Sequence, residues 1–366
     1  GNASTVYVVN TGQPIVVPDA QNNPLAASLH DIARKRGTHC WMIVPLMARG
    51  EVVGTIGMPT SDTKRIFKAE EVALAQTIAN QVVGAIDNAR LFSETEKARQ
   101  QAEQDLEIGR KIQTDFFPEK IPEFPGWEIS AHFKAARQVT GDFYDIIPLG
   151  NGEKVAVVIA DVCDHGVGSA LFMVLFRSLI RAFIRQNFST EISTQDDQDR
   201  QLDTCLTNTI VETNNYIVHT HERSGMFATV FLGILDPKTG LLKYINGGHE
   251  APMIIDRNGG KTCLEKSGPA VGMYPDLDYA IKQIQIDSEE TFFAFTDGVI
   301  DAQSPAGKDF SRGRLLELLA QPSPSTMDLL NRITNEIRRH VFDTEPFDDI
   351  TLLAVRRMNL ESEKEL

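Results

Sequence analysis

The stretch from Lys68 to Phe117 constrains the fold of this 366-residue chain most strongly, because it lacks proline and repeats apolar residues at helical spacing. The repeating residues are Val72, Ile78, Val82, Val83 and Ile86. A single helix over this stretch would be roughly 75 Å long at about 1.5 Å per residue, which exceeds an ordinary domain helix. We therefore expect two domains joined by a helical linker.

Residues 93–118 are predicted to form this linker, which ends where prolines interrupt the helical pattern. The segment is rich in Glu, Gln, Lys, Arg and Ala. It carries a narrow stripe of apolar or small residues: Ala98, Ala102, Leu106, Gly109, Ile112 and Phe116. The stripe fits a solvated helix that contacts its own domains, or a short parallel coiled coil that forms a homodimer. We favour the dimer, because a long polar helix has little else to stabilise it.

The regions on either side of the linker differ in their strand and helix patterns. Before it, residues 14–20, 40–47 and 51–58 are typical of strands, with a hairpin turn at 48–50. After it, further strands are predicted at 155–160, 226–235, 241–246, 252–256, 279–286, 291–296 and 349–356, and helices at 166–187, 200–221, 311–320 and 325–341. Strands outnumber helices here and most are joined by turns, so an α+β sandwich flanked by helices is expected.

Charge, hydropathy and cysteine usage exclude several classes of protein. The net charge is −14 and no Lys/Arg-rich block occurs, so a nucleic-acid partner is not expected. We find no apolar run approaching the roughly 18–20 residues of a membrane span, and no signal-peptide pattern at the start. The four cysteines are far apart and lack CxxC spacing, which argues against disulfides or a zinc site and favours a reducing cytoplasm.

Aspartates recur where predicted apolar strands begin or end, and this pattern carries the chemical information. They are Asp142, Asp145, Asp161, Asp297, Asp348 and Asp349. A buried ionised carboxylate without a partner is costly, and no Lys or Arg lies beside these positions in the sequence. Oxygen-only ligation by carboxylates is what Mg²⁺ or Mn²⁺ prefers, and two such ions can activate a water and hold a phosphate. The ordinary alternative, a turn or helix N-cap residue, is favoured only for Asp145 and Asp164.

Other catalytic chemistries find less support. A cysteine phosphatase would need an arginine six positions after Cys163, where Ser169 stands, and no nucleophile elbow, P-loop or HExxH motif occurs. His219 and His221 lie at a predicted helix end and are expected at the surface. His249, at a turn between strands, is left open between a structural role and one near the substrate, including proton donation to the leaving group.

These residues, in this order, resemble the bacterial SpoIIE/RsbU-like serine phosphatases of the metal-dependent protein phosphatase (PPM) superfamily. The matching segments cover nearly all of residues 105–357: LEIGRKIQTDFFP (106–118), GDFYD (141–145), IADVCDHGVGSALFM (159–173), MFATVFLGILD (226–236), NGGHEAPMI (246–254), GPAVGM (268–273), FTDGVIDA (295–302) and FDDITLLAV (347–355). The resemblance implies a PPM-type αββα sandwich of two antiparallel sheets flanked by helices.

The resemblance also implies a centre of two Mn²⁺ or Mg²⁺ ions between the sheets, and catalysis through water held by the ions. By position, Asp161 would bridge both ions beside the backbone carbonyl of Val162, and Asp297 and Asp348 would be further ligands. Asp142 would hold the second ion through water, and Asp349 ranks below these. The catalytic set is thus Asp142, Asp161, Asp297 and Asp348. Asp164 departs from the family pattern, where a small residue is usual, so it would tune metal affinity or cap the following helix.

Residues 1–92 resemble the later part of a GAF sensor domain, an α/β fold. The matching segments are TGQPIVVPDA (11–20), IVPLMARGEVVGTIGM (43–58) and FKAEEVALAQTIANQVVGAIDNARLF (67–92). The opening strands of such a domain are absent, so the GAF domain is partial. GAF domains bind small molecules or only dimerise, so a small-molecule ligand is one expectation. Cys40 is expected in the core or at a sheet edge, and not as a pigment attachment site.

Together these features predict a cytoplasmic, sensor-regulated protein serine/threonine phosphatase of bacterial partner-switching and stress signalling. The implied substrate is a phosphorylated anti-sigma-factor antagonist of the STAS fold. The predicted domains are 1–92 (partial GAF), 93–118 (linker), 119–357 (phosphatase) and 358–366 (tail). Linker residues Ile112 and Phe116 are predicted to transmit regulation. The alternatives are a catalytically weak phosphoprotein-binding module and a Mg²⁺-dependent small-molecule phosphatase.

Overall fold

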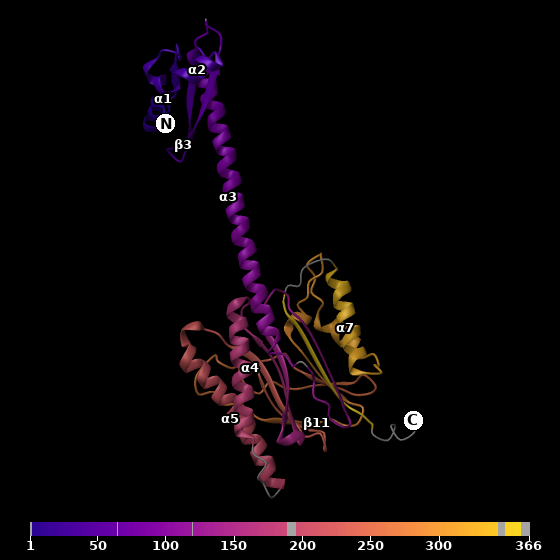
Figure 1. Ribbon diagram of the computed structural model, residues 1–366. Coiled ribbons are helices and arrows are strands. Elements are labelled where there is room, and N and C mark those ends of the chain that lie inside the picture. The colour runs from indigo at the N-terminus through magenta and orange to yellow at the C-terminus, as the bar shows by residue number, and fades with distance from the viewer. Residues whose placement is uncertain (1, 64, 119, 189–194, 343–347, 360–366) are drawn as a thin grey trace. The chain divides into compact units, whose positions relative to one another are not determined.

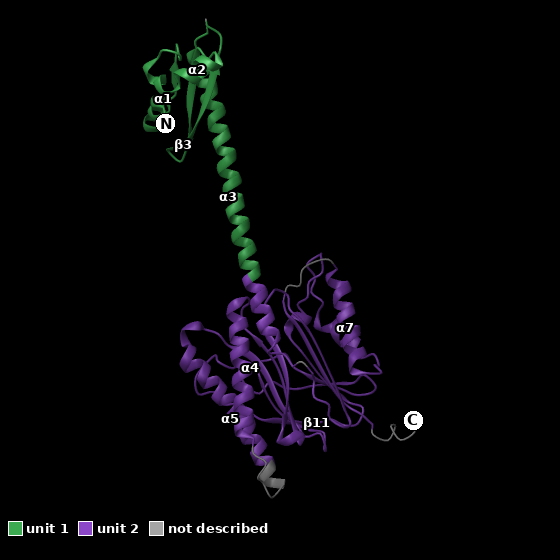
Figure 2. Cartoon of the chain, viewed as in Figure 1, with its two compact units in different colours: residues 1–104 green, residues 105–366 purple. Residues whose placement is uncertain are grey.

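The computed structural model describes residues 2–63, 65–118, 120–188, 195–342 and 348–359, with backbone only at 195–198. The chain divides into two compact units, Gly1–Gln104 and Asp105–Leu366 (Figure 2). The division falls within helix α3 (Ala69–Thr114) and within the predicted linker segment 93–118.

Unit 1 is a three-stranded antiparallel sheet with helices packed against it (Figure 1). Its elements are α1 (Ala3–Thr11), β1 (Ile15–Val17), the 3₁₀ helix η1 (Pro24–Leu29), α2 (His30–Arg36), β2 (Cys40–Ala48), β3 (Glu51–Thr60) and the first part of α3. The three predicted strands are confirmed, whereas α1 and α2 were not predicted. The turn at 48–50 is also confirmed: Arg49 and Gly50 both have positive φ, as a two-residue hairpin joining right-twisted strands requires.

Helix α3 packs on this sheet through small residues. Ala75 and Ala79 are buried against Met42 and Val44 of β2. Residues spaced four apart on a different face of α3 remain exposed, namely Leu74, Ile78, Val82 and Ile86. The helical period predicted from the sequence is confirmed, but part of the apolar pattern faces solvent.

Unit 2 contains two five-stranded antiparallel sheets, with strand orders β10-β9-β12-β13-β4 and β11-β8-β7-β6-β5. The strands are β4 (Trp127–Lys134), β5 (Asp142–Leu149), β6 (Lys154–Val162), β7 (Ala228–Leu235), β8 (Leu241–Gly247), β9 (Met253–Ile255), β10 (Lys261–Cys263), β11 (Lys282–Gln285), β12 (Thr291–Phe295) and β13 (Ile350–Arg357). The helices are α4 (Val167–Asn187), α5 (Gln195–His221), α6 (Arg312–Leu319) and α7 (Thr326–Val341), with 3₁₀ turns η2 (Gly150–Gly152), η3 (Glu222–Ser224) and η4 (Asp297–Val299). The short strand β10 was not predicted.

Strand β6 shows why the sheets stack between helices. Val157 and Ile159 belong to the apolar cluster between the two sheets, whereas Ala156 and Val158 belong to the cluster under α4 and α5. Both faces of this strand are therefore buried, which explains its continuous apolar sequence. A third cluster packs α6 and α7 on the other sheet (Figure 1). Unit 2 is thus the predicted αββα sandwich.

Helix α4 corrects the expectation that no segment is long and apolar enough to span a membrane. Its 21 residues include an 18-residue window of mean hydropathy 1.8. In unit 2 one face of this helix is buried: Met173, Phe176, Ile180 and Ile184 pack in the cluster with β5, β6 and α5. An apolar helix that packs in a sandwich core passes the same length and composition test.

Candidate metal centre at the ends of the two sheets

Asp142 and Asp161 lie directly opposite each other where β5 begins and β6 ends. Opposite residues in an antiparallel ladder place their side chains on the same face of the sheet. Asp142 is 2% exposed and Asp161 is half-buried. These two carboxylates, which one hairpin separates in the sequence, therefore lie on neighbouring strands.

Asp142 also joins the two sheets. Its Oδ2 accepts hydrogen bonds from the hydroxyls of Thr296 and Thr351, each at 2.7 Å. Thr296 follows β12 and Thr351 lies in β13, so both donors belong to the opposite sheet. Burial, followed by the charges of Asp161 and Asp349, holds the pKa of Asp142 well above its usual range.

Asp297 and Asp348 approach from that second sheet. Asp297 begins η4 directly after β12, and Asp348 lies two residues before β13, where its Oδ1 accepts the Asp349 N–H at 2.8 Å. Gly298 makes this approach possible, since a Cβ there would lie 2.0 Å from the backbone oxygen of Asp349. Burial, followed by the charge of Asp348, raises the pKa of Asp297 to about 6.

Electrostatic coupling makes these carboxylates one cluster. Burial and then the charges of Asp297 and Asp348 raise the pKa of Asp161 to about 7. Burial also raises the pKa of Asp348. Within the described ranges, the four carboxylates of Asp142, Asp161, Asp297 and Asp348 form no ion pair with Lys, Arg or His. The cluster thus concentrates negative charge that no described side chain pairs with directly, and Arg137 and His165 act only on Asp348, at longer range.

The donor chemistry of this cluster fits a hard divalent cation. All the side-chain donors are carboxylate oxygens, and the Val162 carbonyl stays accessible because Gly141 has no side chain: a Cβ there would lie 2.9 Å from that oxygen. However, the described carboxylates do not lie close enough together to surround a single metal ion. Among the described residues, no three His, Cys, Asp or Glu side chains are arranged closely enough to hold a metal ion.

Asp349 is engaged in hydrogen bonds that hold the loop before β5. Its Oδ1 accepts the Ala136 N–H at 2.8 Å, and its Oδ2 accepts the Gly141 N–H at 3.0 Å and the Thr140 hydroxyl. These three bonds occupy both carboxylate oxygens. They favour a structural role for Asp349 beside the cluster, consistent with its lower rank as a ligand.

Asp145 is neither a turn residue nor a helix cap, which corrects the sequence interpretation. It lies within β5, is 1% exposed, and binds Arg177 at 2.9 Å and Arg181 at 2.5 Å through its Oδ2. Both arginines come from α4, which is why no partner was visible near Asp145 in the sequence. Asp145 therefore belongs to a buried ion-pair network and not to the acidic cluster.

Asp164 and Cys163 lie beside the cluster without joining it. Asp164 is exposed in a turn with φ of +68°, which confirms the first of its two expected roles, whereas Gly166 and not Asp164 takes the N-cap position of α4. The Cys163 sulfur accepts the Phe227 N–H, and burial raises the pKa of its thiol. A protonated thiol is a poor nucleophile, consistent with the prediction that Cys163 is a bystander.

His249 is a buried, neutral side chain. Its Nδ1 lies 2.9 Å from the Thr229 hydroxyl, and Thr229 is paired with Asp161 across β6 and β7. Burial, followed by the charge of Lys266, lowers the pKa of His249 to about 3. An imidazole that is neutral at pH 7 carries no acidic proton for a leaving group, so the geometry favours the structural alternative.

Gln113 contributes to the site in a way the sequence did not indicate. It is 6% exposed, and its side-chain amide donates to the Thr140 carbonyl at 2.8 Å and accepts the Thr140 N–H at 3.0 Å. Thr140 in turn donates its hydroxyl to Asp349 and accepts the Asp142 N–H. The end of α3 is thus connected to the cluster through one residue. Glutamine in a polar helical segment carries no sequence signal of this kind.

Ile112 and Phe116, the two linker residues predicted to transmit regulation, are less buried than Gln113. Ile112 is 57% exposed, and Phe116 is half-buried. Leu106, Gly109 and Ile112 line an apolar cavity of about 220 Å³ against α4. Phe117, just beyond the stripe, stacks on Phe133 with ring centroids 4.5 Å apart. Part of the stripe therefore contacts its own unit, as the first of the two interpretations required.

Comparison with known proteins places this architecture in a family. A family model described as "Stage II sporulation protein E (SpoIIE)" matches residues 151–358, and a GAF domain model matches residues 1–86. Protein IcfG of Synechocystis is 40% identical over 263 residues, covering 69% of this chain and 41% of that protein. Phosphoserine phosphatase RsbP of Bacillus subtilis is 25% identical over 197 residues, covering 54% and 45%. The chain thus spans less than half the length of these two relatives.

Solved structures show the same fold. The SiaA-PP2C domain of Pseudomonas aeruginosa matches with a TM-score of 0.57 at 19% identity, over 71% of this chain and 98% of that domain. The RsbU and RsbW domains of a Mycobacterium tuberculosis protein match with a TM-score of 0.50 at 21% identity, over 65% and 63%. At these identities the likeness concerns the fold alone. Because the SpoIIE model covers more than half of the chain, this protein is a member of the SpoIIE family that also carries a GAF domain.

Proposed function

We propose that this protein is a metal-dependent protein serine/threonine phosphatase. The observation that carries the proposal is the cluster of four aspartates, contributed by both sheets, whose charge no described cation neutralises. Relatives named as phosphoserine phosphatases, and membership of the SpoIIE family, support the same activity.

The proposed ligands are those expected from the sequence: Asp142, Asp161 with the Val162 carbonyl, Asp297 and Asp348, around two Mn²⁺ or Mg²⁺ ions. When bound, divalent cations supply Lewis acidity for the attacking water and for the phosphoryl oxygens. Asp161 lies centrally in the electrostatic coupling, so it is the proposed bridging ligand.

The protein's own residues position this chemistry. Asp142 keeps the sheet ends together through Thr296 and Thr351. Asp349 holds the loop that carries Gly141, which keeps the Val162 carbonyl open. Neither Cys163 nor His249 takes part as nucleophile or acid in this scheme, so the leaving serine oxygen draws its proton from solvent-derived water.

The proposed substrate is a phosphoserine or phosphothreonine on a partner protein, specifically a STAS-type anti-sigma-factor antagonist of bacterial stress signalling. Support comes from relatives named RsbP and RsbU, both called phosphoserine phosphatases of Bacillus subtilis. The four cysteines are free, which is consistent with activity in a reducing cytoplasm.

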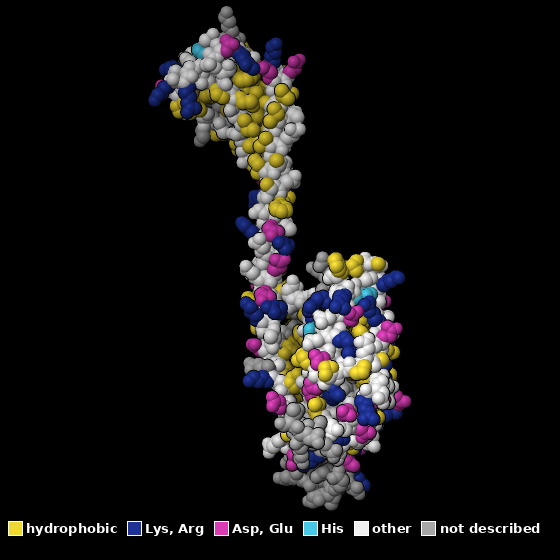
Figure 3. Space-filling view, turned by 90° about the vertical axis from the view of Figure 1, so that its right-hand side faces the viewer, with side chains coloured by type: hydrophobic (Ala, Val, Ile, Leu, Met, Phe, Trp, Pro, Cys, Tyr) yellow, Lys and Arg dark blue, Asp and Glu magenta, His cyan; other side chains and the backbone are white. Residues whose placement is uncertain are grey.

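The proposed domains are those predicted, with a GAF sensor at 1–92, a linker at 93–118, the phosphatase at 119–357 and a tail at 358–366. We propose a homodimer that forms through the GAF domain and α3. The exposed apolar stripe of Leu74, Ile78, Val82 and Ile86 supports this, and Figure 3 shows hydrophobic side chains gathered over unit 1. Apolar patches of this kind commonly mark interaction surfaces.

Regulation through the linker is proposed to act on the loop that Gln113 holds. A shift of the last turn of α3 would break its two bonds to Thr140 and thereby loosen Asp349 and the start of β5. Ile112, in the last turn of α3, and Phe116, just beyond the helix end, remain proposed transmitters because they flank Gln113 in the sequence. A small molecule bound by the GAF domain is the proposed input.

The test is a Mn²⁺-dependent phosphatase assay on a phosphorylated STAS partner, comparing the wild type with Asp297→Asn. Release of phosphate by the wild type, lost on metal removal and in the variant, is the expected result. If the wild type releases no phosphate from the phosphoprotein at any Mn²⁺ concentration, the proposed activity is wrong.

One observation favours a second function, a phosphoprotein-binding module with weak turnover. The described carboxylates do not form a closed ligand group of three or more side chains. In that case the phosphoprotein would bind the wild type and Asp297→Asn equally, and neither would release phosphate. The same assay, followed by a binding measurement, separates the two functions.

A further inference from the structure

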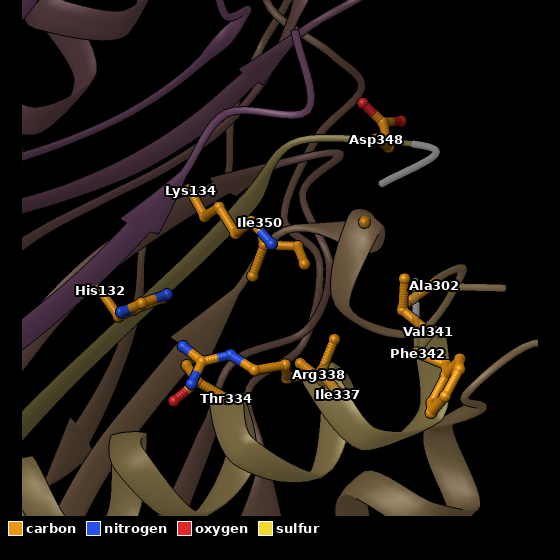
Figure 4. Close-up of a pocket in the computed structure, with 11 residues that line it drawn as sticks. His132, Lys134, Ala302, Thr334, Ile337, Arg338, Val341, Phe342, Asp348 and Ile350 are labelled. Atoms are coloured by element: carbon orange, nitrogen blue, oxygen red, sulfur yellow. The ribbon is translucent and has the colours of Figure 1, made fainter. Parts of the chain in front are cut away.

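A cavity of about 120 Å³ opens between α7, β4 and β13, beside the acidic cluster. Asp348 and Gly298 form one wall, so the cavity adjoins the proposed reaction site directly. Its interior is mostly apolar, with Ile337 and Val341 from α7 and Ile350 from β13. Figure 4 shows these side chains around one hollow, with Asp348 at its far end.

Basic side chains gather at the other side of this cavity. Lys134 and His132 come from β4, and Arg338 comes from α7; Figure 4 shows all three around the same space. The three side chains are close enough to interact. Burial lowers the pKa of His132 most, and the positive charges of Lys134 and Arg338 lower it further. Two cations and an imidazole are thus held together in a chain whose net charge is −14.

These basic groups lack the partners that neighbouring arginines have. Arg339, next along α7, pairs with Glu336 at 2.5 Å, and Arg314 of α6 also pairs with Glu336, at 3.0 Å. Across the described part of the chain, neither Lys134 nor Arg338 forms an ion pair or a side-chain hydrogen bond, and Asp348 does not lie within pairing distance of either. Lys134 and Arg338 are both exposed, so solvent screens their mutual repulsion and both remain accessible to an incoming anion.

We propose that this cavity binds an acidic side chain of the phosphoprotein substrate, flanking the phosphoserine that enters the aspartate cluster. The proposal rests on the proposed phosphatase function and extends it to substrate selection. An anion here would gain from two cations that no described side chain pairs with, whereas the phosphoryl group itself would meet Asp348. The cavity volume suits a single carboxylate-bearing side chain and excludes a nucleotide or a folded segment. Lys134 and Arg338 are then specificity-determining residues.

The experiment uses the full chain with Mn²⁺ and two synthetic phosphoserine peptides, identical except that the three residues on each side of the phosphoserine are all Glu or all Gln. The readout is the ratio of kcat/KM for the two peptides. We expect the wild type to prefer the Glu peptide by about tenfold, equal to about 1.4 kcal/mol. The double variant Lys134→Gln/Arg338→Gln should bring the ratio close to one. The matched control Arg339→Gln, which alters a neighbouring arginine outside the cavity, should keep the wild-type ratio.

A wild-type ratio near one, or a double variant that keeps the preference, overturns the inference and leaves the phosphatase proposal intact. If the wild type hydrolyses neither peptide, fluorescence anisotropy of the same labelled peptides decides the inference, and the phosphoprotein assay described above decides the phosphatase proposal separately. Tighter binding of the Glu peptide that disappears in the double variant supports the cavity, and equal binding of both peptides contradicts it. A melting curve for each variant confirms that it is folded.

Discussion

The start and the middle of strand β5 carry the same residue type in opposite electrostatic settings. Asp142 at its start and Asp145 further along are 2% and 1% exposed. Asp145 is surrounded by Arg177 and Arg181, whereas Asp142 is surrounded by Asp161, Asp349 and two threonine hydroxyls. Burial alone therefore says nothing about role. The charges contributed by other elements decide which aspartate is structural and which is left with unsatisfied charge.

The difference has opposite consequences for stability. A buried carboxylate between two arginines stabilises the folded chain mainly because its removal would leave uncompensated cations. A buried carboxylate among carboxylates destabilises the folded chain until a proton or a cation joins it. The arginine-paired middle of β5 is thus stable by itself, and its acidic end can bind a proton or a cation.

The largest expected effect lies at Asp145, in the arginine-paired middle of β5. Asp145→Ala should lower the free energy of unfolding by about 3–5 kcal/mol, because Arg177 would remain buried without a partner. Urea unfolding without divalent cations measures it, with Asp142→Asn as the matched variant on the same strand. An equal loss in the free energy of unfolding in Asp145→Ala and Asp142→Asn would contradict the proposed difference between the two aspartates.

At the acidic end, Asp161→Asn should reduce Mn²⁺-dependent phosphatase turnover by about a hundredfold or more. Loss of a residue that only hydrogen-bonds to a metal ligand costs about 10- to 100-fold, and loss of the ligand itself should cost more. The metal-free variant should be more heat-stable than the wild type at pH 7.5, because one repelling charge is gone. Steady-state kinetics and a melting curve measure the two effects. Asp164→Asn, in the exposed turn nearby, is the control and should change neither. A turnover that survives in Asp161→Asn would contradict the assignment.

A smaller effect is expected where α3 supports the acidic end. Gln113→Ala would leave the buried N–H and C=O of Thr140 without partners, which costs about 1–3 kcal/mol. The loosened loop should weaken the apparent Mn²⁺ affinity about tenfold, measured as the Mn²⁺ concentration for half-maximal turnover. Lys111→Ala, exposed on the same helix, is the control. Unchanged Mn²⁺ dependence in Gln113→Ala would show that α3 does not support the site.

The smallest effect is a pH dependence confined to the acidic end. The folded-state pKa values of Asp161 and Asp297, about 7 and about 6, lie above the unfolded value near 4. The folded chain therefore binds more protons than the unfolded chain in this range, and stability falls as pH rises from about 5 to about 8. With a chelator present, Tm should fall by about 4 °C over that interval. Saturating Mn²⁺ should remove the fall, and a Tm that rises with pH in chelator would contradict the prediction.

Much of the fold was predictable because local patterns agree with tertiary packing. The continuous apolar run in β6 fits a strand buried on both faces, and the Arg49–Gly50 turn fits a two-residue hairpin. The helices of unit 1 before β2 were missed because short helices leave little periodic signal. The acidic cluster was predictable in composition, since aspartates at strand ends are visible in the sequence.

Three features of the site were not predictable from local sequence. Asp145 finds its arginines on α4, and Gln113 finds Thr140 in the loop before β5. Asp348 and Asp349 are adjacent and identical, yet one carboxylate faces the cluster and the other holds a loop through three hydrogen bonds. In each case the deciding partner lies far away in the chain.

The sequence by itself determined the two-part organisation, most strands and helices, and the concentration of carboxylates that points to cations. These features depend on periodicity, turn residues and residue type, which act over short range. Only the tertiary structure decided which carboxylates share a site, which have arginine partners, and which basic side chains line the cavity beside Asp348. Electrostatic energy depends on distance in space, and folding brings together charges that the chain keeps far apart.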